Sequence, residues 1–147
     1  MAFLFVLVLV LIVYGSLYPF NLSSQPPSAE TIETFLWSWR QIGSRGDVLG
    51  NVALFVPYGF LGMLALPPKD AAVRRFALLL AIGFTVAAGV QVAQLYLPSR
   101  DAALGDVAWN ALGCLIGAAL TLPAAVRDRL TTRAPALETI VPLALIA

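Results

Sequence analysis

Two short stretches of this sequence combine carboxylate and amide side chains at a spacing that could serve chemistry. Gly46-Asp47-Val48-Leu49-Gly50-Asn51 and Gly105-Asp106-Val107-Ala108-Trp109-Asn110 share the pattern Gly-Asp-Val-x-x-Asn, and each begins an apolar run. In a helix the aspartate and the asparagine, at i and i+4, lie one turn apart on one face. Pro98-Ser99-Arg100-Asp101 adds a guanidinium group just before the second stretch. Charged groups so close to hydrocarbon are costly and therefore predict a functional site.

Seven polar residues, all expected near the same face of the membrane, make up the predicted ligand-binding site. They are Asp47, Asn51, Gln91, Gln94, Arg100, Asp106 and Asn110. The arginine would suit a phosphate or carboxylate, whereas two aspartates with amide oxygens could hold a hard divalent cation. The set predicts binding of a lipid phosphate or an envelope precursor headgroup, directly or through a metal. The identity of any metal or cofactor stays open.

Each of these residues also has a purely structural explanation. An aspartate near a helix N-terminus is favoured by the helix macrodipole. Asparagine and glutamine side chains can hydrogen-bond between helices, each contributing about 0.6–2 kcal/mol. The structural explanation is preferred for any one residue, but the whole set favours a ligand site.

Composition excludes several classes of protein. The chain has no histidine, which removes the commonest general base and transition-metal ligand. Cys114 is the sole cysteine and cannot form an internal disulfide. A net charge of +1 gives no basic surface for nucleic acid. Of the 147 residues, 60% are hydrophobic and 12% charged, which is typical of a membrane protein.

The apolar residues are gathered into runs that predict an all-α membrane protein. Four transmembrane helices are expected over residues 2–20, 47–66, 76–97 and 106–122, because about 20 apolar residues cross a bilayer. The first run lacks a basic start and a cleavage site, so a retained helix is preferred over a signal peptide. The repeated phrase suggests that spans one-two and three-four form two similar hairpins. Such repeats commonly place a binding site at their interface.

The longest polar connection should contain a short helix capped by Ser28. Its apolar residues follow helical spacing, and they are Ile32, Phe35, Leu36 and Trp39. This helix either lies in the headgroup region or packs on the bundle as an ordinary amphipathic helix.

The predicted domain organisation is a four-helix transmembrane domain over residues 1–125, followed by a basic segment and apolar tail over 126–147. The closing run from Ala134 reaches roughly 20 Å and is too short to cross. It would be re-entrant, interfacial or half of a fifth span. Lys and Arg in the loops place both termini on the cytoplasmic side. Six such residues (Lys69, Arg74, Arg75, Arg127, Arg129, Arg133) oppose three (Arg40, Arg45, Arg100).

Glycines mark a packing face on the last predicted span. Gly113 and Gly117 follow Asp106 and Asn110 in one stripe, and their Gly-x-x-x-Gly spacing would let another helix approach closely.

The chain resembles the VanZ-like family of small bacterial membrane proteins over roughly Ser16 to Leu120. The residues that carry the resemblance are Asp47, Asn51, Phe55, Pro57, Gly59, Gln94, Pro98, Arg100, Asp106, Asn110, Gly113 and Gly117, together with the first-helix ending Ser16 to Phe20. The resemblance implies a multi-pass protein of the bacterial cytoplasmic (inner) membrane. It also implies a link to antibiotic resistance, since the family's named member is linked to teicoplanin (glycopeptide) resistance without destroying the drug. No catalytic residue is carried over.

One departure from the family bears on function. Family members usually have a glutamate where this chain has Gln91, and a buried glutamate could accept a proton. The amide can only hydrogen-bond, which lowers the expectation of an enzyme.

Three functions stay open, in decreasing order of preference. The first is a non-enzymatic protein that binds or modulates an envelope lipid or precursor. The second is an accessory subunit whose Gly113 and Gly117 face docks another membrane protein. The third is an enzyme acting on a lipid headgroup through Asp47 or Asp106 with Arg100. The expected partners are membrane lipids, and no nucleic acid is expected.

Overall fold

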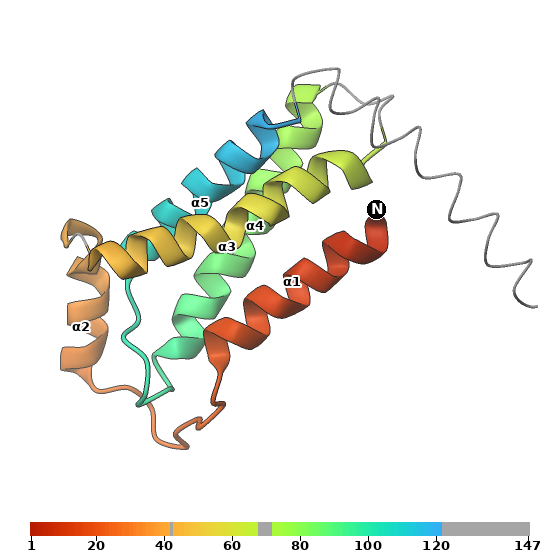
Figure 1. Ribbon diagram of the computed structural model, residues 1–147. Coiled ribbons are helices and arrows are strands. Elements are labelled where there is room, and N and C mark those ends of the chain that lie inside the picture. The colour runs from red at the N-terminus through yellow and green to blue at the C-terminus, as the bar shows by residue number, and fades with distance from the viewer. Residues whose placement is uncertain (42, 68–71, 122–147) are drawn as a thin grey trace, which may run out of the picture.

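The described part of the chain is entirely helical. The structure is a computed structural model that describes residues 1–41, 43–67 and 72–121. Its helices are α1 (Ala2–Leu17), α2 (Ala29–Trp37), the 3₁₀ helix η1 (Ser38–Arg40), α3 (Arg45–Ala65), α4 (Ala72–Gln94) and α5 (Leu104–Ala119). The four long helices form a bundle, and α2 lies across one end of it (Figure 1).

The helix ends follow local rules that the sequence carries. Tyr18, the residue after α1, precedes a proline and takes an extended conformation, so the helix is three residues shorter than the predicted run. The N-cap of α2 is Ser28, whose hydroxyl accepts the N–H of Thr31 at 3.1 Å, as predicted. Pro67, which follows Leu66, closes α3 in the same way.

The two helices that begin with the repeated phrase, α3 and α5, pack against each other along the bundle. The first hairpin continues from α1 into α3, and the second from α4 into α5. Within each hairpin the two helices are in contact, and α1 also contacts α4. Both Gly-Asp-Val phrases therefore open their helices at the same end of the bundle, next to α2 (Figure 1).

The core lies between the four long helices and is centred on Tyr58. This side chain is fully buried, and its hydroxyl donates to the Leu79 carbonyl at 2.8 Å. Phe5 and Phe55 pack against it with tilted rings, whose centroids lie 5.2 and 5.6 Å from the Tyr58 ring centroid. The single cysteine, Cys114, is also buried there.

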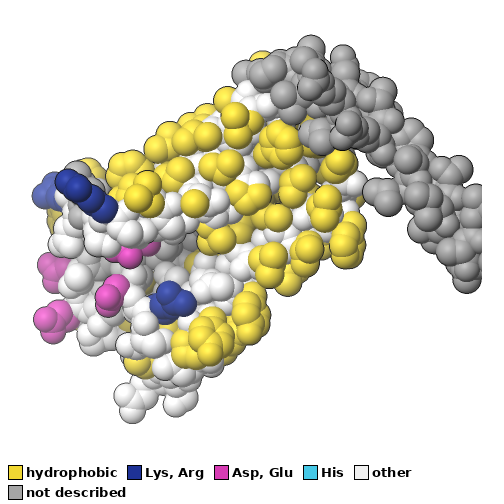
Figure 2. Space-filling view, viewed as in Figure 1, with side chains coloured by type: hydrophobic (Ala, Val, Ile, Leu, Met, Phe, Trp, Pro, Cys, Tyr) yellow, Lys and Arg dark blue, Asp and Glu magenta, His cyan; other side chains and the backbone are white. Residues whose placement is uncertain are grey.

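Two helices, α3 and α4, are long and apolar enough to cross a membrane, while α1 and α5 are shorter apolar helices. In each of the two longer helices only 28% of the apolar window is buried. Figure 2 shows hydrophobic side chains over most of the outer surface in this view, and charged groups gathered at the end that carries α2. This distribution differs from that of a soluble protein, in which such helices would be mostly buried.

The short α2 helix packs on the bundle with only part of its predicted apolar face. Of the four apolar residues expected on one face, only Phe35 is buried, and Trp39 belongs to η1. Ile32 and Leu36 stay exposed. The helix touches the bundle through too narrow a face to cover the whole stripe. The predicted basic segment and apolar tail lie outside the described residues, as does the predicted boundary after residue 125.

Candidate functional site

One polar cavity of about 620 Å³ opens at the α2 end of the bundle. All seven residues predicted from the sequence line it: Asp47, Asn51, Gln91, Gln94, Arg100, Asp106 and Asn110. They come from α3, α4, α5 and the segment that joins the last two helices. Asp101 and Ser99 of that segment also line the cavity. The structure thus gathers the predicted set in one place.

Asp47 is partly used to start its own helix. Its Oδ2 accepts hydrogen bonds from the Ser44 N–H at 3.1 Å and the Ser44 hydroxyl at 2.7 Å. In return the Ser44 hydroxyl accepts the Asp47 N–H at 3.2 Å, which completes a capping box. The carboxylate is exposed, and its charge acts on Asp106 across the cavity.

Asp106 is held between two amide side chains. Gln91 Nε2 donates to its Oδ2 at 3.3 Å, and the Asn51 amide also interacts with this carboxylate. The other end of the Gln91 amide, Oε1, accepts the Ala103 N–H at 2.8 Å. Gln91 is buried and therefore fixes the start of α5 against the end of α4.

Arg100 is tied to the end of α1. Its Nε and Nη2 donate to the Tyr18 carbonyl at 3.1 and 2.9 Å, and Nη2 also donates to the Gly15 carbonyl at 3.1 Å. A cation that binds free carbonyls at a helix C-terminus is favoured by the macrodipole. The residue predicted to bind an anion therefore spends much of its donor capacity on the bundle. Gln94 acts similarly, since its Nε2 donates to the Ser16 carbonyl at 2.9 Å.

Asn110 differs from the other amides of the cavity. Its side chain is 5% exposed, and its Oδ1 has no hydrogen-bond partner among the described residues. Because it lies one turn along α5 from Asp106, it marks the deeper end of the cavity wall.

The predicted glycine face packs inside the chain. A Cβ on Gly113 would collide with the Val52 carbonyl, and one on Gly117 with the Val56 carbonyl. Gly59 of α3 meets α5 in the same close manner. The glycines let α3 and α5 approach backbone to backbone, so this face is already covered by α3. The expectation that it docks another membrane protein is wrong for this reason.

Several contributors to the site were not anticipated from the sequence. The buried Ser38 hydroxyl accepts the Leu104 N–H at 2.7 Å and so caps α5 from a distant part of the chain. Gly15 and Gly50 line the cavity, and a Cβ on either would meet no atom within 4 Å. Asp101 lies beside Arg100 in the sequence but is not a member of the predicted set.

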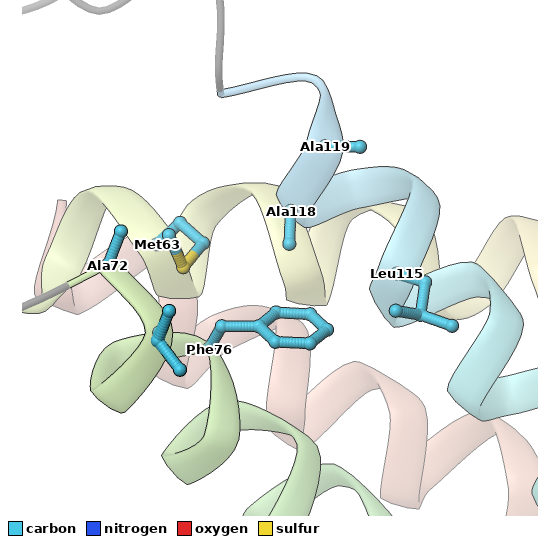
Figure 3. A pocket seen from close by; sticks show the side chains of 7 residues that line it. Met63, Ala72, Phe76, Leu115, Ala118 and Ala119 are labelled. Carbon is cyan, nitrogen blue, oxygen red and sulfur yellow. The ribbon is translucent and has the colours of Figure 1, made fainter.

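Further cavities adjoin the described part of the bundle, and two of them bear on the site. One, of about 840 Å³, lies under α2 and shares Gln94, Arg100 and Asp101 with the polar cavity. The other, of about 330 Å³, lies at the far end between α3, α4 and α5. Figure 3 shows that Met63, Phe76 and Ala118 border the latter space. Its lining side chains are apolar, so it offers no group for recognition of a polar ligand.

The carboxylates are too few for a protein-built metal site of the usual kind. Across residues 1–41, 43–67 and 72–121, no group of three or more His, Cys, Asp or Glu side chains could hold a metal ion. The predicted divalent-cation site would use the carboxylates of Asp47 and Asp106 with amide oxygens, and the Asp47 carboxylate is engaged in a helix cap.

Comparison with known proteins decides the family. The VanZ/LLP1 family model matches residues 1–126. This chain belongs to the VanZ/LLP1 family. No curated protein and no solved structure matches it. The family assignment, together with two helices that are apolar enough to span a bilayer, indicates a membrane protein.

Proposed function

We propose that this VanZ/LLP1 protein is a multi-pass protein of the bacterial cytoplasmic membrane that binds the headgroup of an envelope lipid or lipid-linked precursor. The observation that carries the proposal is the gathering of all seven predicted polar residues around one cavity at the end of an apolar bundle. Single structural roles explain individual members of this set, but they do not require an open cavity of headgroup size between them.

The outer surface of the bundle supports a membrane setting. Large hydrophobic side chains stay exposed along it, including Phe3 of α1 at 76% and Phe84 of α4 at 60%. In this proposal α1 and α5 are the remaining two spans. Each has 16 residues and so rises roughly 24 Å, which a slightly thinned bilayer accommodates.

The side chains of the α2–η1 segment support a position of the cavity at the depth of the lipid headgroups. Trp37 and Trp39 are about half exposed, and the Arg40 guanidinium lies 4.3 and 5.0 Å from their ring centroids. Tryptophan with a neighbouring cation is typical of membrane–water interfaces. A helix with these side chains beside the cavity would hold the cavity mouth among the lipid headgroups.

The loop charges support the orientation given above, with both termini cytoplasmic and the cavity at the outer face. An outward-facing lipid-binding site would agree with the family's link to teicoplanin resistance. In this proposal the protein modulates the envelope by binding rather than by chemistry.

A matched pair of glycine variants tests the proposal. Gly50→Leu places a side chain in the cavity, whereas Gly89→Leu places one on the exposed side of α4, and neither Cβ meets an atom within 4 Å. Native mass spectrometry of the full chain in mild detergent should show retained phospholipid or isoprenoid phosphate in the wild type and in Gly89→Leu. Gly50→Leu should lose most of it. Equal retention in all three, or no retained lipid at all, would contradict the proposal.

A further inference from the structure

One residue of the cavity lining, Asn110, has a hydrogen-bond acceptor without a partner among the described residues. Its side chain is 95% buried, and the acceptor is the Oδ1 atom. A buried carbonyl oxygen costs free energy unless it accepts a hydrogen bond or meets a cation. A ligand that fills the cavity is therefore expected to bring an N–H group, an O–H group or a positive charge to this atom.

Several hydrogen-bond donors near the cavity that could bind an anion already donate to protein atoms. Arg100 donates from Nε and Nη2 to backbone carbonyls at the end of α1. The Ala103 and Leu104 N–H groups, at the start of α5, donate to side chains of α4 and η1. The Asp47 N–H donates to its own N-cap. The helix starts around the cavity therefore do not present these N–H groups to a phosphate.

The charge of the cavity wall also favours a cationic ligand group. Three carboxylates line it, those of Asp47, Asp101 and Asp106, against the single guanidinium of Arg100. Asp106 accepts a side-chain hydrogen bond from Gln91, and a carboxylate has about four lone-pair sites, so it can accept more. Its neighbour one turn deeper is Asn110, whose Oδ1 has no partner among the described residues. A carboxylate beside an unpartnered carbonyl favours a cationic donor.

We propose that the inner end of the cavity, at Asp106 and Asn110, binds the primary ammonium group of an aminophospholipid of the phosphatidylethanolamine class. The inference deepens the proposed function and rests on it. An ammonium brings a positive charge and three N–H donors, which match a carboxylate and a free carbonyl. A divalent cation instead requires about six oxygen ligands. The headgroup phosphate lies toward the exposed Arg100 at the rim, where Nη1 is left to contact it.

Titration with lipids that differ only in their headgroups tests this assignment. The detergent-solubilised full chain is titrated with dihexanoyl phosphatidylethanolamine, phosphatidylcholine and phosphatidylglycerol, and each Kd is measured by calorimetry. Phosphatidylethanolamine should bind at least tenfold more tightly than phosphatidylcholine, whose trimethylammonium keeps the charge but has no N–H donor. Equal affinities for the two would overturn the ammonium site and leave headgroup binding in place. Binding of none of the three would also overturn the ammonium site, and the lipid retained in native mass spectrometry then decides the proposed function.

The same titration also tests the alternative that a metal ion, rather than an ammonium group, occupies the acceptors. If phosphatidylglycerol binds as tightly as phosphatidylethanolamine, and does so only with Mg²⁺ present, a cation occupies the acceptors and the ammonium proposal is overturned. Insensitivity of phosphatidylethanolamine binding to a chelator is the result expected.

Replacement of Asn110 tests whether its side-chain carbonyl causes the preference for phosphatidylethanolamine. Asn110→Leu keeps the size of the side chain and removes its carbonyl, so the preference for phosphatidylethanolamine over phosphatidylcholine should fall from tenfold to threefold or less. The melting temperature should not fall. The control Thr85→Val, on the exposed side of α4 and outside the cavity, should keep the preference. An unchanged preference in Asn110→Leu would overturn the assignment.

Discussion

Gln91 donates a hydrogen bond from Nε2 to Asp106 Oδ2 across 3.3 Å, and this contact joins the end of α4 to the start of α5. The same amide accepts the Ala103 N–H at 2.8 Å through Oε1. The Gln91 side chain thus donates to a carboxylate through its nitrogen and accepts from a backbone N–H through its oxygen. A glutamate at this position could accept the N–H but could donate to the carboxylate only when protonated.

Gln91→Glu should therefore make the stability of the protein depend on pH. At pH 8 two facing carboxylates would repel, and we expect a loss of about 1–3 kcal/mol in the free energy of unfolding. As the pH falls toward 5 the pair takes up a proton and regains its hydrogen bond, so most of the loss should disappear. Thermal unfolding in detergent at the two pH values measures this. Gln25→Glu, on an exposed loop, should show no such dependence, and an equal loss at both pH values would contradict the argument.

Ser38→Ala should loosen the start of α5. Its hydroxyl accepts the Leu104 N–H at 2.7 Å and donates to the Phe35 carbonyl at 2.6 Å. Loss of such a cap costs about 1–2 kcal/mol. Hydrogen exchange at the Leu104 amide should become faster, by roughly tenfold or more for a local opening of that size. Ser24→Ala, at an exposed position, is the control. Unchanged exchange at Leu104 would show that this hydroxyl is dispensable.

Local signals in the sequence predicted much of this fold. The apolar runs predicted the four long helices to within a few residues, because prolines after Tyr18 and Leu66 and the Ser44 cap set the nearby helix ends. The repeated Gly-Asp-Val phrase predicted a common level for Asp47 and Asp106, since two similar hairpins bring equivalent helix starts to one end. The seven polar residues consequently line a single cavity.

Contacts between distant segments could not be read from the sequence. The Ser38 hydroxyl reaches Leu104 only because α2 folds over the start of α5, and nothing near either residue signals this. Arg100 was expected to bind an anion, yet it turns to the carbonyls left free at the end of α1. Its side-chain type fitted both roles, and only the position of α1 selects between them.

Gly113→Ala should destabilise the bundle because α3 and α5 touch backbone to backbone at this point. A Cβ there would collide with the Val52 carbonyl, which cannot move without shifting the helix. Overpacking of this kind costs about 1–3 kcal/mol. Gly89→Ala is the matched control, because its Cβ would meet open space and alanine favours a helix by about 0.5–1 kcal/mol. Melting temperatures in detergent should therefore fall for the first variant and rise slightly for the second. Equal effects would contradict the close approach.

Arg100→Lys separates a structural from a ligand-binding role for the arginine. The guanidinium bridges the Gly15 and Tyr18 carbonyls with a planar fork, and an ammonium on a flexible stem cannot reproduce this geometry. Since Arg100 is exposed, we expect a loss of only about 0.5–1 kcal/mol in stability. The amides that close the last turn of α1, such as that of Tyr18, should exchange faster. Lipid retention should largely persist, because the lysine still offers a positive charge at the rim. Loss of retained lipid with unchanged exchange at α1 would show instead that the arginine acts mainly on the ligand.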